Sequence, residues 1–83
     1  MNTLQIIQFY LHENKLKTIC LPNEQILIIY RPNHYIELWE YDETTIQILK
    51  INKSNTKAKG DMDSTQIDLT YPNSLQQILE TCT

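Results

Sequence analysis

The sequence predicts one α+β domain spanning residues 1–83: a four- to five-stranded antiparallel meander sheet with a helix at each end of the chain, in the order α-β-β-β-β-β-α. Three observations support this fold class. Residues 25–51 hold three β-rich runs separated by turn-like pieces, both ends of the chain show helical apolar spacing, and 83 residues suffice for one core. Because short hairpin connections join antiparallel neighbours, we expect the strands to pair in chain order.

The first element is expected to be an amphipathic helix over residues 4–13. Asn2 stands where it can cap this helix, with Gln5 three residues further on in the capping-box position. The residues that fall on the apolar side of this helix are Leu4, Ile6, Ile7, Tyr10 and Leu11. Residues 15–21 alternate loosely and indicate a first strand, which Pro22-Asn23 ends in a turn.

The centre of the chain predicts three strands joined by four-residue loops at 31–34 and 42–45. These loops set Tyr30 opposite Tyr35 in the first hairpin. In the second hairpin they set Tyr41 opposite Ile46, and Glu37 opposite Lys50 as an oppositely charged pair. Side chains alternate between the two faces along a strand, so this register also sorts the residues by face.

One predicted face is aliphatic, and both helices are expected to pack on it. Its residues are Leu27, Ile29, Ile36, Leu38, Leu49 and Ile51. The opposite face is predicted to be aromatic and apolar with two charges in it. Its residues are Ile26, Ile28, Tyr30, Tyr35, Glu37, Trp39, Tyr41, Ile46, Ile48 and Lys50.

The remainder of the chain predicts a loop, a strand and a helix. Residues 52–66 are polar, contain the only glycine, and form a longer connection than a usual hairpin, so we expect a flexible loop. Ile67, Leu69 and Tyr71 alternate with polar residues and indicate a last strand, which Pro72 ends. The final helix follows Asn73 and Ser74, its two candidate caps. Its apolar stripe consists of Leu75, Ile78, Leu79 and Cys82.

Charge and composition exclude several classes of protein. A net charge of −3 disfavours a general binder of phosphate backbones, which usually has an excess of basic residues. Two cysteines are too few for a disulfide scaffold, and no apolar run approaches the length of a membrane span. The expected location is therefore the cytoplasm.

No motif in the sequence predicts catalysis, a metal site or a cofactor, so we expect a protein that is not an enzyme. Residues 61–65, DMDST, match the D-x-D-x-T spacing of a phosphotransferase loop, but the apolar strand that such a loop must follow is missing. His12 and His34 have no cysteine or carboxylate at ligand spacing on a shared element.

The aromatic face is the strongest functional signal. A contiguous apolar patch of this size is larger than monomers normally expose. Three interpretations remain open: a helix covers it, a second copy covers it in a homodimer, or it docks another protein, with the acidic residues beside it steering a basic partner. The candidate partner-binding residues are Tyr35, Glu37, Trp39, Glu40, Tyr41, Asp42 and Glu43.

We therefore expect a small acidic protein that binds and modulates a larger protein. This profile is common among inhibitors, adaptors and products of phages and mobile elements, including proteins that block host defence. One alternative is a nucleic-acid-binding module that uses a run of lysines, and another is a homo-oligomeric structural subunit. The lysines of this run are Lys50, Lys53, Lys57 and Lys59.

Overall fold

The structure is a computed structural model that describes residues 3–21, 25–52 and 62–83. It has an N-terminal helix, five strands and a C-terminal helix, which confirms the predicted α+β class and element order. The elements are α1 (Thr3–Glu13), β1 (Ile19–Leu21), β2 (Ile26–Tyr30), β3 (His34–Asp42), β4 (Thr45–Asn52), β5 (Met62–Asp68) and α2 (Ser74–Cys82). The candidate cap Asn2, the turn at Pro22-Asn23 and residues 53–61 lie outside the described residues.

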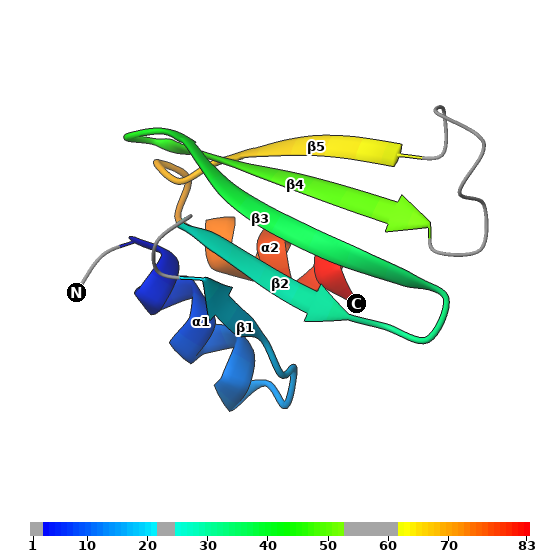
Figure 1. Cartoon of the computed structure of the whole chain (residues 1–83). Helices are drawn as coiled ribbons and strands as arrows, with labels where there is room; N and C mark the ends of the chain where they lie inside the picture. Colours follow the sequence, from blue (N-terminus) through cyan, green and yellow to red (C-terminus); the bar gives the residue numbers. More distant parts are fainter. Residues whose placement is uncertain (1–2, 22–24, 53–61) are drawn as a thin grey trace.

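The five strands form one antiparallel sheet in the order β1-β2-β3-β4-β5, as the meander prediction requires. Both helices lie on the same side of this sheet (Figure 1). The hydrophobic core fills the space between the helices and the sheet. It joins Leu4, Ile7 and Leu11 of α1 with Ile78 and Cys82 of α2. The strands contribute Leu27, Ile29, Ile36, Leu38, Ile46, Ile48 and Ile67.

The first hairpin has the predicted register. Tyr30 lies opposite Tyr35, Ile28 opposite Glu37 and Ile26 opposite Trp39. The backbone N–H of Arg31 donates to the carbonyl of His34 at 2.9 Å and closes the loop. Leu38 therefore faces the helices while Trp39 faces away from them, as the sequence predicted.

The second hairpin is shifted by one residue from its predicted register, and that prediction is wrong. Trp39 pairs with Gln47 and Leu38 with Ile48, since β3 contains a bulge between Glu40 and Asp42. The strand reverses over two residues, because the Asp42 carboxylate accepts the N–H of Thr44 at 2.9 Å and holds a tight turn. One extra residue in β3 moves every side chain of β4 to the other face.

This shift exchanges the two faces of β4. Ile46 and Ile48 are buried in the core, although they were predicted on the aromatic face. Leu49 and Ile51, predicted in the core, lie on the opposite face. Lys50 pairs with Ile36 on the helix side, so the predicted pairing of Glu37 with Lys50 does not form.

The strands at the two sheet edges also differ from their predicted bounds. The first strand begins at Ile19, because the N–H of Leu16 returns to the carbonyl of Leu11 at 2.9 Å and Leu16 enters the core. The last strand occupies Met62–Asp68, so residues 62–66 pair with β4 although they were predicted as loop. Polar side chains at 63–66 are exposed along this edge, which is why they carry no apolar alternation.

The helices differ from prediction in two details. Ile6, predicted on the apolar side of α1, is 46% exposed. At α2 the helix begins at Ser74 after the N-cap residue Asn73, whose side chain makes no capping hydrogen bond. The Asn73 side chain instead accepts the amide of Gln77 at 3.1 Å.

Candidate protein-binding face

The side of the sheet turned away from both helices is the candidate site, and we call it the open face. Neither helix of the described chain lies on it (Figure 1). Helix coverage of the aromatic side chains, one of the three interpretations left open above, is therefore wrong for the described residues. Strand alternation and the observed register give its members. They are Ile19, Leu21, Ile26, Ile28, Tyr30, Tyr35, Glu37, Trp39, Gln47, Leu49, Ile51, Ser64 and Gln66.

The open face is built in rows that run across the strands. One row reads Leu21, Ile26, Trp39, Gln47, Gln66. The next reads Ile19, Ile28, Glu37, Leu49, Ser64. The third reads Tyr30, Tyr35, Ile51. Apart from Glu37, the side chains of β1 to β3 in these rows are apolar, although Ile26 is only 5% exposed. Polar side chains gather at β5, so the apolar surface surrounds Glu37 and is bounded on one side.

The aromatic side chains of the open face are exposed but held in place. Trp39 is 38% exposed, and its indole Nε1 donates to Glu37 Oε1 at 3.0 Å. Tyr30 is 58% exposed, and its ring lies 6.3 Å from that of Tyr35, centroid to centroid. Side chains already ordered in the free protein lose less conformational entropy on binding.

Two carboxylates lie at one end of the open face. Thr45 of β4 lies between them: Asp42 of β3 is its partner on one side and Asp68 of β5 its partner on the other. Each accepts the backbone N–H of the residue two positions on, Thr44 or Thr70, at 2.9 Å. Each also accepts the hydroxyl of that same threonine, at 3.2 Å and 2.7 Å respectively.

These hydrogen bonds fix the charge state of this end. The backbone N–H of Thr44 lowers the pKa of Asp42, and that of Thr70 lowers the pKa of Asp68. A smaller opposing effect is the negative charge of Asp42, which raises the pKa of Asp68. Both carboxylates are therefore ionised at neutral pH, and the end of the open face carries two adjacent negative charges.

The structure divides the seven candidate binding residues. Tyr35, Glu37 and Trp39 lie on the open face and Asp42 lies at its end. The remaining three lie around the hairpin: Tyr41 is 60% exposed at the bulge, Glu43 is exposed in the turn, and Glu40 pairs with core-facing Ile46 on the helix side.

Sequence reasoning missed several residues of this face. Ile19 is 51% exposed in β1, and Asp68 joins Asp42 only through the pairing of β5 with β4. The alternation of 19–21 was a usable signal for Ile19, but nothing local to Asp68 points to Asp42. Leu49 and Ile51 were missed because of the bulge.

The lysine run does not form a described cluster. Lys50 is half-buried on the helix side, where its charge acts on the Cys82 thiol. Burial raises the pKa of that thiol to about 12, against the smaller lowering effect of Lys50. The other three lysines of the run lie outside the described residues.

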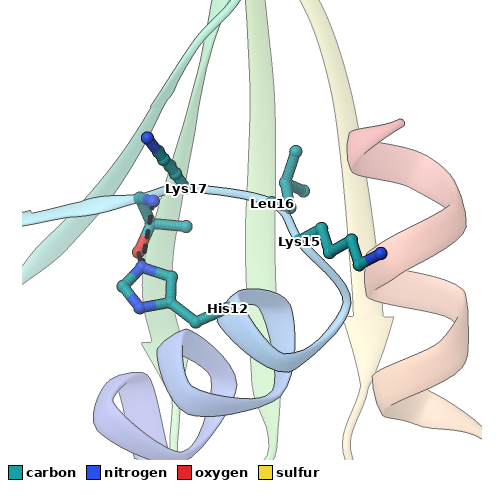
Figure 2. A pocket seen from close by; sticks show the side chains of 5 residues that line it. His12, Lys15, Leu16 and Lys17 are labelled. Carbon is teal, nitrogen blue, oxygen red and sulfur yellow. Dashed lines mark hydrogen bonds between the residues drawn. The ribbon is translucent and has the colours of Figure 1, made fainter.

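A hollow of about 580 Å³ lies where α1 leads toward β1 (Figure 2). Its lining residues are His12, Lys15, Leu16, Lys17 and Thr18. His12 Nε2 accepts the backbone N–H of Thr18 at 3.1 Å and lies 3.1 Å from the Thr18 hydroxyl. The imidazole thus links the end of α1 to the segment that leads into β1, and the described lining residues all come from this short segment.

Within residues 3–21, 25–52 and 62–83, no group of three His, Cys, Asp or Glu side chains is placed to hold a metal ion. None of the helices in these segments is long and apolar enough to span a bilayer. Cys20 and Cys82 are free thiols. Comparison of the chain with protein-family models, with curated proteins and with solved structures finds no significant match.

Proposed function

We propose that this chain is a non-enzymatic protein that binds and modulates a larger protein partner through the open face. The observation that carries the proposal is the contiguous apolar surface on the side of the sheet that neither helix covers. Isolated exposed apolar residues are ordinary, but a contiguous patch with ordered aromatics is typical of an interaction surface. Tyr30, Tyr35 and Trp39 supply the side-chain types that dominate the energetics of protein interfaces.

The charges on this face favour a protein over a nucleic acid. Glu37 stands beside Trp39, and the Asp42 and Asp68 carboxylates close one end. Phosphate groups brought to the aromatic side chains would be repelled by these carboxylates. A protein with lysine or arginine at the matching position would be attracted, which speeds association and orients the partner. We propose a partner that is basic where it meets this end.

An inhibitor or adaptor of this kind acts by occupying its partner's surface and needs no chemistry of its own. Products of phages and mobile elements that block host defence often work in this way, and this chain shares their small size and acidity. The two free thiols fit a reducing compartment, so we place the activity in the cytoplasm.

The test is capture of the partner with matched aromatic variants. Tyr30→Ala and Trp39→Ala truncate exposed side chains of the open face, while Phe9→Ala truncates a 63% exposed side chain on α1 as the control. Circular dichroism establishes that each variant is folded. The captured partner is then purified and its Kd measured against every variant by calorimetry at two salt concentrations.

We expect the two open-face variants to weaken binding at least tenfold and Phe9→Ala to leave the Kd unchanged, because a truncated hot spot costs about 2 kcal/mol or more. Raising the salt concentration should weaken binding of the partner by wild type. The double variant Asp42→Asn, Asp68→Asn should show a smaller loss of affinity over the same change in salt. Loss of binding in Phe9→Ala together with retention in folded Tyr30→Ala and Trp39→Ala would refute the proposal.

A further inference from the structure

The free edge of the sheet at β5 is a second surface, independent of the open face. Among the described residues, β5 pairs only with β4 and spans seven residues, whereas the other edge strand, β1, spans three (Figure 1). Its register with β4 is continuous from Met62 to Asp68 without a bulge. Residues 62–68 also contain no proline and no lysine, two devices that commonly protect an edge from further pairing.

The hydrogen-bond phase of β5 follows from one contact beyond its end. The N–H of Leu69 donates to the carbonyl of Thr44 at 2.7 Å, in line with the register of the two strands. Hydrogen-bonded and non-hydrogen-bonded pairs alternate along an antiparallel ladder. Counting back from Leu69, the backbones of Ile67, Thr65 and Asp63 bond to β4. The backbone groups directed to the free edge are those of Met62, Ser64, Gln66 and Asp68.

We propose that this edge pairs antiparallel with β5 of a second copy of the chain, with Thr65 facing Thr65 across a two-fold axis. Ser64 then lies opposite Gln66, Asp63 opposite Ile67 and Met62 opposite Asp68. Every outward-directed backbone group meets another outward-directed group, and all seven residues of each strand are paired. Threonine pairs are favourable cross-strand neighbours.

Charge, hydrogen-bond phase and the number of paired residues together favour this register over its neighbours. The strand has two charged residues, Asp63 and Asp68, and in the proposed register neither faces another carboxylate. A shift by one residue breaks the hydrogen-bond phase, and one of the two such shifts sets Asp63 against Asp68. A shift by two keeps the phase but leaves two residues of each strand unpaired.

No described element obstructs the approach of a second β5. Asp63 and Thr65, which lie on the helix side of the strand, are exposed, so α2 does not cover them. Ser64 and Gln66 are exposed on the other side. The Gln47 side-chain amide donates to Ser64 Oγ at 2.6 Å from β4, on the side of β5 away from the free edge. The dimer would be one continuous sheet to which each copy contributes its five strands, with all helices on one side and both open faces on the other.

The first experiment measures the mass of the full chain in solution by sedimentation equilibrium over a range of concentrations. Wild type is expected to approach twice the mass of the chain as concentration rises. Gln66→Pro removes an edge-directed N–H without touching the ladder to β4, so it should remain a monomer with unchanged circular dichroism. Gln66→Thr keeps that N–H and is the matched control, expected to dimerise like wild type.

The second experiment tests the register and does not depend on how proline is tolerated. In a Cys20→Ser background, Thr65→Cys should form an intermolecular disulfide on oxidation, since facing residues of a non-hydrogen-bonded pair have Cα atoms about 4.5 Å apart. Ser64→Cys is the control and should not cross-link, because Ser64 faces Gln66 and not itself. A monomeric wild type at every concentration would overturn the proposal, as would a dimer that persists in folded Gln66→Pro or cross-links better through Ser64→Cys.

Discussion

Replacing Ile48 by alanine should destabilise the protein severely, whereas the same change at Ile51 should have a small effect. Ile48 is 1% exposed and belongs to the core beneath the helices, while Ile51 is half-buried on the open face. Truncating a fully buried isoleucine to alanine costs about 2–5 kcal/mol, through lost apolar burial and the cavity left behind. At a half-buried position the cavity term largely disappears, and we expect about 1 kcal/mol.

These costs are large compared with the total free energy of unfolding. A chain of 83 residues has a free energy of unfolding of about 4–12 kcal/mol. At a cost of about 2–5 kcal/mol, Ile48→Ala is therefore expected to remove at least about a sixth of this free energy, and at the upper cost a large part of it. The milder Ile48→Val, at about 0.5–1.5 kcal/mol, keeps the protein folded and should lower Tm by about 2–12 °C.

Urea unfolding followed by far-ultraviolet circular dichroism measures both changes, with the fluorescence of Trp39 as a second probe. The two variants carry the same chemical change three residues apart on one strand. Their difference therefore reports which face of β4 packs under the helices. Equal costs, or a larger cost at Ile51, would refute the observed register of β4 and with it the composition of the open face.

Two further predictions follow from perturbed side chains. Because the pKa values of Asp42 and Asp68 lie below the ordinary 3.8, their contribution to stability is complete above that pH and is lost as pH falls through the lowered values. The double variant Asp42→Asn, Asp68→Asn should lose less stability below about pH 4 than wild type in urea titrations, and an unchanged slope would contradict this. Because burial raises the pKa of Cys82 to about 12, its thiol should resist alkylation at pH 8 until the chain unfolds, whereas half-buried Cys20 should react first. Mass spectrometry of the labelled native protein checks this, and prompt labelling of Cys82 would count against its burial.

Local sequence was sufficient where the alternation had a single reading. The order of elements came from apolar periodicity and turn residues, and the β2–β3 register came from a loop bounded by Tyr30 and Tyr35. In this hairpin Tyr30, Tyr35, Trp39 and Glu37 share one face with Ile26 and Ile28, while Leu27, Ile29, Ile36 and Leu38 make the other face wholly aliphatic. A slip by one residue would bury Glu37, so the pattern admits one solution.

The same reasoning failed at β4 because its alternation has two readings. Ile46 and Ile48 alternate with Gln47, Leu49 and Ile51, and either set forms an acceptable apolar face. The choice was made by the bulge in β3 and by the turn that the Asp42 carboxylate stabilises. A last strand was predicted, but residues 62–66 of β5 were predicted as loop, since an exposed edge strand has little apolar burial to leave a period in its sequence.

The sequence by itself thus determined the fold class, the meander and the presence of an aromatic face, because each depends on local propensity and spacing. The sequence predicted that both helices pack on the aliphatic side but left open whether a helix also covers the aromatic face, and in the structure α1 and α2 both pack on the aliphatic side. The acidic end likewise exists only because the sheet brings Asp68 beside Thr45 and Asp42, far apart in the chain. Only tertiary structure decides these features, because they arise from contacts between elements that no local pattern encodes.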